Sequence, residues 1–209
     1  AGLHVAKFLE FTKEEFHSNA TIANTIELAY PIFVKPTLGG SSVGVGKVKN
    51  PEELKIKLEK LFQSEDRILL QEFVPGREVS CGVVEQTVNG KYQAHALAAT
   101  EIIPMSDFFD YESKYTIGKS KEITPADISK ELMKEIQNSA LKAHSILGCE
   151  GYSRTDFIIN DNKPFILETN TLPGMTATSI LPQQAEYAGI KMEDLLDNLI
   201  ENALVRVKN

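Results

Sequence analysis

The sequence predicts an α+β fold in which hairpin-linked strands pack against amphipathic helices. Two turn signals, at Asn89–Gly90 and Asp161–Asn162, each separate two apolar segments. Apolar residues at helical spacing follow the capping residues Asn50 and Thr124, and recur near the end of the chain. Hairpins make neighbouring strands antiparallel. The pattern therefore favours an α+β chain over a doubly wound parallel sheet.

The composition is that of a globular protein. The chain has 209 residues, of which 42% are hydrophobic and 24% charged. No apolar run approaches the roughly 18 residues of a membrane helix, and the first ten residues lack a signal-peptide pattern. The net charge of −7, with dispersed basic residues, argues against a nucleic-acid partner. Cys81 and Cys149 form no CxxC motif, so we expect reduced, buried thiols in a cytoplasmic protein.

The first third of the chain predicts two helices and two strands. Thr12–Glu15 fits a capping box and predicts a helix that starts there. A second helix is expected over Thr21–Ala29 and must end before Pro31. Ile32–Lys35 is a short apolar strand, and Val43–Val48 is its expected return strand.

The next segment predicts a capped helix followed by three strands. Asn50 is the expected N-cap, with Pro51 at the first helical position. One buried stripe is expected from the apolar spacing of Leu54, Leu58, Leu61 and Phe62. Strands are expected over Arg67–Val74, Glu78–Glu85 and Tyr92–Ile103. Residues 106–121 are aromatic, polar and aperiodic, and predict a long functional loop.

The last third predicts two helices around a hairpin. Thr124, with Pro125 after it, is the expected cap of a long helix that Gly148 ends. Its expected apolar stripe is Ile128, Leu132, Ile136, Ala143, Ile146 and Leu147. Arg154–Ile159 and Phe165–Glu168 are the expected hairpin strands. A final helix over about Met192–Val207 is expected to bury Leu195, Leu196, Leu199, Ala203 and Leu204.

A glycine-rich segment is the first candidate for chemistry. Gly39–Gly44 contains two serines, and such loops present backbone N–H groups and hydroxyls to anions. It matches neither the Walker A nor the GxGxxG pattern, and an ordinary turn is the alternative. Lys35 ends the preceding strand, with Phe33 on the same face, which suits phosphates and a nucleotide base. A surface lysine is the alternative interpretation.

A set of polar residues on the predicted hairpin is the second candidate. Alternation places Arg154 and Asp156 on one face, and Glu168 and Asn170 on one face of the next strand. A three-residue loop at Asp161–Lys163 would set Asp156 opposite Glu168 at about 5 Å. Two carboxylates at that distance repel by roughly 3 kcal/mol, which a bound cation such as Mg²⁺ would remove. A solvated face bridged by Arg154 is the alternative.

Weaker signals come from the long loop and from a turn. Lys114 could reach a phosphate or an oxyanion, although a charged, mobile loop is the more common interpretation. Glu78 could accept from a ribose hydroxyl or be an ordinary surface acid. The four histidines are isolated and lack zinc-ligand spacing.

Taken in order, these motifs resemble the ATP-grasp fold, and specifically the D-alanine–D-alanine ligase family. The motifs that carry the resemblance are Phe33–Pro36 with Gly40–Gly44, Gln71–Glu78, Phe109–Tyr115, Gly151–Asp156 and Leu167–Met175. The resemblance covers essentially the whole chain. It implies two α+β subdomains that hold ATP between them, residues 1–73 as the small central one and residues 74–209 as the large C-terminal one.

The resemblance also implies residue roles toward ATP. Lys35 contacts the phosphates and Ser41 and Ser42 close over them, while Phe33 and Leu167 border the adenine. The segment Gln71, Glu72, Phe73 and Val74 hydrogen-bonds the adenine, largely through its backbone, and Glu78 holds the ribose. Phe109 and Lys114 belong to the loop that closes over the nucleotide. An acid often stands in the family where this chain has Gln71.

Further implied roles concern the metal and the reaction. Asp156, Glu168 and Asn170 bind two Mg²⁺ ions, for which Mn²⁺ can substitute. Arg154 and the Gly174 amide stabilise the tetrahedral oxyanion. Ser179 meets the carboxylate of the second D-alanine. Lys114 and Tyr115 close over the site, and Tyr115 indicates peptide rather than ester synthesis.

The reaction implied is the ligation of two D-alanines for peptidoglycan synthesis. One D-alanine carboxylate attacks the γ-phosphate, and the amine of the second attacks the resulting acyl phosphate. The family also has an N-terminal domain that binds the first D-alanine. The resemblance implies that the full-length enzyme is a homodimer. We expect this chain to start after that domain, as an inactive fragment. Another ATP-grasp carboxylate–amine ligase, or a nucleotide-binding module without turnover, is the alternative.

Overall fold

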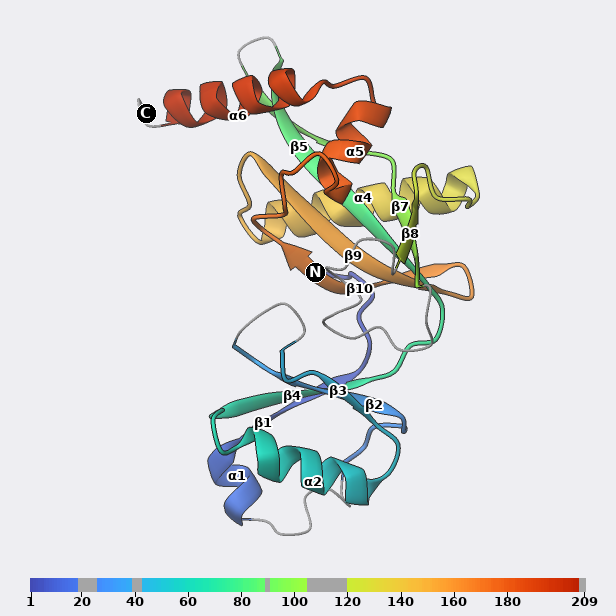
Figure 1. The fold of residues 1–209 in the computed structure, drawn as a ribbon, viewed down its shortest axis with the longest axis vertical. Coiled ribbons are helices and arrows are strands. Elements are labelled where there is room, and N and C mark those ends of the chain that lie inside the picture. The colour runs from blue at the N-terminus through green and yellow to red at the C-terminus, as the bar shows by residue number, and fades with distance from the viewer. Residues whose placement is uncertain (19–25, 39–42, 89–90, 105–119, 207–209) are drawn as a thin grey trace. The chain divides into compact units, whose positions relative to one another are not determined.

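The computed structural model describes residues 1–18, 26–38, 43–88, 91–104 and 120–206. These residues form two compact units. The smaller unit contains the described residues of 6–74, and the larger unit contains those of 1–5, 75–105 and 118–209. Each unit contains one β-sheet with its own helices (Figure 1). All pairs between the strands described are antiparallel, which confirms the predicted α+β class.

In its described residues, the smaller unit is a four-stranded sheet backed by two helices. Its elements are β1 (Phe8–Thr12), α1 (Lys13–Ser18), β2 (Ile32–Pro36), β3 (Gly46–Val48), α2 (Pro51–Leu61) and β4 (Arg67–Glu72). The strand order is β1-β4-β2-β3, and both helices lie on one side of the sheet (Figure 1). The predicted return strand over Val43–Val48 is therefore correct only in its last three residues.

Local sequence signals explain both helix starts in this unit. The Thr12 hydroxyl accepts from the Glu15 N–H, and the Glu15 carboxylate accepts from the Thr12 N–H at 2.8 Å, which is the predicted capping box. Asn50 caps α2 by accepting from the Glu53 N–H at 2.8 Å. The expected stripe of α2, which includes Leu54 and Leu58, is buried against β2 and β4. Each such leucine contributes roughly 1.5–3 kcal/mol of stability.

The larger unit is a six-stranded sheet between helices. Its strands are β5 (Arg77–Val88), β6 (Lys91–Ala96), β7 (Thr100–Pro104), β8 (Ser120–Ile123), β9 (Tyr152–Asn160) and β10 (Lys163–Asn170). Its helices are α4 (Lys130–Ile146), α5 (Ile180–Tyr187) and α6 (Met192–Arg206). The strand order is β10-β9-β5-β7-β8, and β6 pairs with β5.

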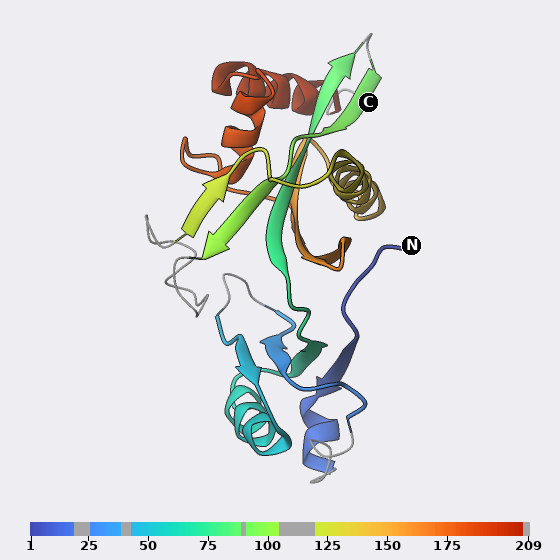
Figure 2. The ribbon, with the colours of Figure 1, turned by 90° about the vertical axis from the view of Figure 1, so that its right-hand side faces the viewer.

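Alternation along β5 and β9 separates two cores in the larger unit. Val79, Cys81 and Phe157 point to α4, whereas Val84 packs with Leu181 and Leu195 of α5 and α6. Figure 2 shows α4 (yellow) on one side of β5 (green) and α5 and α6 (orange to red) on the other. Residues with even numbers on β5 and β9 therefore face α5 and α6.

Two predictions on α4 are wrong. The cap is Ser129, whose hydroxyl accepts from the Leu132 N–H at 3.2 Å, and not Thr124. Thr124 instead lies within hydrogen-bonding distance of Thr100, and the Ala126 N–H donates to Ala99, so this segment extends toward the sheet. Ile146 and Leu147 of the expected stripe are exposed, and they are the last residue and the C-cap of the helix.

The predicted burial on α6 is largely wrong as well. Leu195 is buried, but Leu196 and Leu204 are exposed, Ala203 is exposed and Leu199 is half-buried. The other buried position is Asn202, whose amide donates to the Glu85 carbonyl at 2.9 Å. The helix thus contacts β5 through a polar hydrogen bond at a position that hydrophobic periodicity does not identify.

Other expectations change in their boundaries. Tyr92–Ile103 is two strands, β6 and β7, rather than one. The part of the expected 106–121 loop that is described, from Ser120 on, belongs to β8. Most of the predicted helix over Thr21–Ala29 lies outside the described residues, and Ile26–Ala29 is not helical.

Neither cysteine forms a disulfide. Cys81 is buried, and burial raises the pKa of its thiol to about 12, which makes it unreactive. Cys149 is only partly buried, contrary to the expectation that both are buried. No helix in the described part of the chain is long and apolar enough to cross a membrane.

Candidate active site

The β9–β10 hairpin positions the predicted metal ligands. Glu168 lies directly opposite Asp156, and Asn170 opposite Arg154. This register confirms the predicted pairing but not the predicted loop. The turn has two residues, Asp161 and Asn162, with φ of 47° and 59°. A bulge between Ile166 and Glu168 supplies the extra residue that brings Glu168 opposite Asp156.

Asp156 is held by donors on two strands. The Ser80 hydroxyl of β5 donates to Oδ1 of Asp156 at 2.5 Å. Arg154 donates from Nε to Oδ1 and from Nη2 to Oδ2, both at 3.0 Å. Burial by itself lowers the pKa of Arg154, but attraction to Asp156, their hydrogen bonds and the charges of Glu168 and Glu78 outweigh it and raise the pKa. Arg154 therefore stays charged at the centre of these carboxylates.

The donor set fits a hard divalent cation. Asp156, Glu168 and the Asn170 amide all supply oxygen, which Mg²⁺ prefers. Among the described residues, no group of three or more His, Cys, Asp or Glu side chains is arranged to hold a metal. A cation at this hairpin would therefore complete its ligands with water or phosphate oxygens, as Mg²⁺ commonly does.

Gly174 and Ser179, the predicted oxyanion and substrate contacts, lie close together. A Cβ on Gly174 would come within 2.8 Å of the Ser179 Oγ, so this position requires glycine or a shift of the serine. Ser179 is the N-cap of α5, and its Oγ accepts from the Thr176 N–H at 3.2 Å. The Ser179 hydroxyl thus faces back onto the loop that carries the Gly174 amide.

The face of the smaller sheet away from α2 carries the predicted adenine contacts. Phe33 lies opposite Gln71 in the β2–β4 register, and its ring centroid is 5.9 Å from that of Phe73. Lys47 places its Nζ 3.4 Å from the centre of the Phe73 ring. Lys35 follows on the same face of β2, opposite Leu69. This face of the sheet therefore carries two aromatic rings and two lysines.

Lys47 is a further member of this surface that the sequence motifs did not predict. The usable signal was its place on a return strand opposite Phe33, since cross-strand neighbours share a face.

Two of the residues predicted to contact adenine, Glu72 and Phe73, already form hydrogen bonds within the smaller unit. The Glu72 N–H donates to Lys7 and its carboxylate accepts from the Ala29 N–H, while the Phe73 N–H donates to Pro31. Gln71 is buried, and Val74 and Glu78 are half-buried. Leu167 lies at the bulge of β10. Ser41, Ser42, Phe109, Lys114 and Tyr115 lie outside the described residues.

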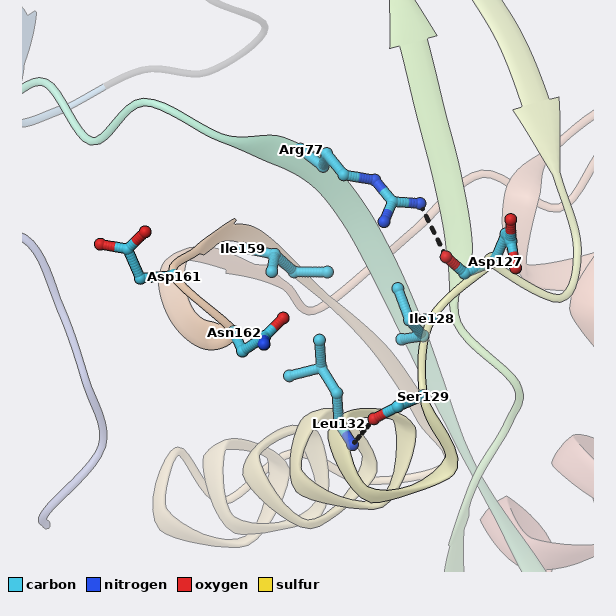
Figure 3. A pocket seen from close by; sticks show the side chains of 8 residues that line it. All are labelled: Arg77, Asp127, Ile128, Ser129, Leu132, Ile159, Asp161 and Asn162. Atoms are coloured by element: carbon cyan, nitrogen blue, oxygen red, sulfur yellow. Dashed lines mark hydrogen bonds between the residues drawn. The ribbon is translucent and has the colours of Figure 1, made fainter.

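A separate pocket of about 740 Å³ lies in the larger unit (Figure 3). It is lined by Arg77, Asp127, Ile128, Ser129, Leu132, Ile159, Asp161 and Asn162. Arg77 donates to both Glu101 carboxylate oxygens at 2.6 Å, and these hydrogen bonds raise its pKa. None of the predicted site residues that the structure describes lines this pocket, so its size does not make it the candidate active site.

Comparison with known proteins identifies the family. A family model described as the C-terminus of D-Ala–D-Ala ligases matches residues 1–201. The chain belongs to the D-alanine–D-alanine ligase family. A D-alanine–D-alanine ligase from Leptospira interrogans is 53% identical over 208 residues, and one from Leptospira biflexa is 51% identical over 203 residues. These matches cover 99% and 97% of this chain but 59% and 58% of the ligases, so the chain spans about three fifths of their length.

Solved structures of ligases share the fold. VanG D-Ala:D-Ser ligase from Enterococcus faecalis matches with a TM-score of 0.79 and 34% identity, over 96% of this chain and 57% of that one. A D-alanine–D-alanine ligase from Bacillus anthracis, solved in complex with ATP, matches with a TM-score of 0.77 and 31% identity, over 99% and 63%. The predicted ATP-grasp fold is therefore confirmed.

Proposed function

We propose that this chain carries the nucleotide, metal and second-substrate contacts of an ATP-dependent D-alanine–D-alanine ligase of cytoplasmic peptidoglycan synthesis. The observation that carries the proposal is the β9–β10 register, which sets Glu168 opposite Asp156 with Arg154 beside them. Family membership supports the same assignment, as does the ATP complex of the Bacillus anthracis ligase.

The proposed reaction proceeds in two steps. The carboxylate of one D-alanine attacks the γ-phosphorus of ATP, and ADP leaves as an acyl phosphate forms. The amine of a second D-alanine then attacks the acyl carbon, phosphate leaves, and D-alanyl-D-alanine results. Bound Mg²⁺ supplies neutralisation of phosphate charge. Asp156, Glu168 and Asn170 are the residues proposed to hold it.

Arg154 and Ser179 have distinct proposed roles. A guanidinium has five N–H donors, and Arg154 uses two of them on Asp156, so three can donate to an oxyanion that develops at the acyl carbon. The Gly174 amide is the proposed second donor. Ser179 is proposed to donate to the carboxylate of the second D-alanine.

The smaller unit supplies the proposed base contacts. Phe33 provides an aromatic face for adenine, and Gln71 to Val74 provide backbone groups. Lys35 is proposed to meet the phosphates with Ser41 and Ser42. In the larger unit, Glu78 is proposed to hold the ribose and Leu167 to border the adenine. The Phe109–Tyr115 loop is proposed to close over the nucleotide. We propose residues 1–73 and 74–209 as the two subdomains. The break between residues 74 and 75 supports this boundary, although residues 1–5 group with the larger unit.

Nucleotide titration tests this proposal. We expect residues 1–209 to bind ATP more tightly with Mg²⁺ than without it, as measured by calorimetry. Glu168→Gln should remove this Mg²⁺ dependence, because it removes an anionic ligand. Glu186→Gln is the matched control, an exposed acid on α5 with no proposed role. Equal binding by parent and Glu168→Gln would contradict the metal assignment.

A second candidate function differs in the second substrate. The likeness to the D-Ala:D-Ser ligase favours testing D-serine. With the full-length protein we expect D-alanine to be preferred over D-serine and, on the strength of Tyr115, over D-lactate. Dipeptide and depsipeptide yields at neutral pH measure this. A preference for D-serine would establish the second candidate, and no turnover with any acceptor would favour a nucleotide-binding module. The full-length protein is proposed to be a homodimer.

A further inference from the structure

Ser80 is a buried hydroxyl that the proposed reaction does not use. Its side chain is 0% exposed and donates to Oδ1 of Asp156 at 2.5 Å, a short hydrogen bond typical of a hydroxyl on a carboxylate. Ser80 and Asp156 lie opposite each other on β5 and β9. Ser80 is therefore a cross-strand neighbour of a proposed metal ligand on the same face of the sheet.

The hydrogen bonds to Asp156 distinguish its two oxygens. Among the described residues, Oδ1 accepts from Ser80 and from Arg154 Nε, whereas Oδ2 accepts from Arg154 Nη2 alone. A carboxylate oxygen has two lone-pair sites. Both sites on Oδ1 are occupied by donors, and one site on Oδ2 is left for a cation.

We propose that Ser80 is a positioning residue that holds Asp156 for coordination of a divalent cation through Oδ2 alone. This inference rests on the proposed metal site. Without the Ser80 hydroxyl, one site on Oδ1 loses its donor at a place closed to solvent, because Ser80 is fully buried and Asp156 is 4% exposed. The carboxylate then keeps only its hydrogen bonds from the Arg154 side chain on β9, and its orientation for the cation is less firmly fixed.

The backbone of Ser80 is fixed by helix α5 and by the neighbouring strand β7. Its carbonyl accepts from Gln184 Nε2 of α5 at 2.7 Å, and the residue pairs with Thr100 on β7. Gln184 is itself fully buried, and its Oε1 accepts from the Gly82 N–H at 2.8 Å. Because α5 also begins at Ser179, one helix fixes both the strand that orients Asp156 and the proposed contact to the second substrate.

Binding of Mn²⁺ in the presence of ADP, measured by electron paramagnetic resonance on residues 1–209, tests the proposal. Ser80→Ala should weaken Mn²⁺ binding by about 10-fold or more, the usual effect of losing a hydrogen bond to a metal ligand. Ser80→Thr retains the hydroxyl and should restore parental affinity. Cysteine is close to serine in size but is a weak hydrogen-bond donor, so Ser80→Cys should weaken Mn²⁺ binding as Ser80→Ala does. The cysteine variant replaces the alanine variant in this test if the latter fails to fold.

Ser153→Ala is the matched control. Ser153 is also fully buried and hydrogen-bonded, but to His144 on the α4 side of the sheet. It should lose stability comparably while keeping parental Mn²⁺ affinity. Suppose that Ser80→Ala and Ser80→Cys both keep parental Mn²⁺ affinity while Glu168→Gln loses it. That result would overturn the proposed role of Ser80 and leave the proposed metal site standing. Absence of Mn²⁺ binding in the parent would overturn this proposal and the metal site together.

Discussion

At the scale of single residues, Asp156 and Glu168 are proposed for one task but lie in different environments. Asp156 is buried, with hydrogen bonds from Ser80 and Arg154, whereas Glu168 is exposed. Repulsion between two carboxylates, which the sequence suggested, is offset here by the charge of the Arg154 guanidinium, which attracts both of them. The two acids should therefore differ in what they contribute to stability.

We predict that Asp156→Asn lowers the free energy of unfolding by about 2 kcal/mol, because the part-buried Arg154 loses its counter-charge. Glu168→Gln should change it by less than about 0.5 kcal/mol, as for most exposed substitutions. Urea denaturation of both variants measures the difference. An equal loss in the two variants would contradict the environments described here.

A second residue-scale prediction concerns Glu85. Burial would raise its pKa, but the Gly151 N–H, Arg206 and His144 outweigh burial and hold the pKa below the ordinary 4.5. A lowered pKa means that this carboxylate stabilises the fold fully above pH 4.5 and loses that contribution as the pH falls through its folded-state pKa. Glu85→Gln should be less stable at neutral pH but lose less stability on acidification, as followed by thermal melts. Parallel pH profiles would contradict this assignment.

At the scale of elements, the β9–β10 hairpin shows how turn and bulge act together. The two-residue turn alone would set Leu167 opposite Asp156, and the bulge before Glu168 moves the carboxylate into that position. The alternation of polar residues was visible in the sequence. The turn length and the bulge were not, because both depend on which backbone hydrogen bonds the sheet allows.

The turn itself gives an element-scale prediction. Asn162 has a φ of 59°, which glycine and asparagine tolerate and β-branched residues do not. Asn162→Gly should leave the free energy of unfolding within about 0.5 kcal/mol, and Asn162→Val should lower it by roughly 1–2 kcal/mol. Guanidinium denaturation compares them. Equal stability of the glycine and valine variants would mean that the turn has another conformation.

At the scale of the whole molecule, the chain has two units with separate cores. The core of the smaller unit joins α2 to β2 and β4, and the larger unit has one core on each face of its sheet. Proposed nucleotide contacts occur in both units, while the proposed metal ligands all lie on the larger one. Nucleotide binding and catalysis can therefore depend on different parts of the protein.

We predict that residues 1–209 bind MgATP but release no phosphate in response to D-alanine. The relatives are longer than the region matched here, and the family's N-terminal domain is the part implied to hold the first D-alanine. Loss of such positioning removes many orders of magnitude in rate. Calorimetry and a phosphate-release assay measure the two properties, with the full-length protein as the control. Robust D-alanine-dependent release from residues 1–209 would contradict the prediction.

The sequence by itself determined the local elements and the family. Capping residues such as Thr12 and Asn50, the stripe of α2 and the polar alternation on the hairpin are short-range patterns, and they predicted the structure well. Tertiary structure decided what depends on distant neighbours. The start of α4 at Ser129 and the exposure of Leu204 depend on how the helices pack on the sheet. The cross-strand bond from Ser80 and the place of Lys47 follow from which strands pair. That pairing brings together residues that are far apart in the chain and carry no local signal.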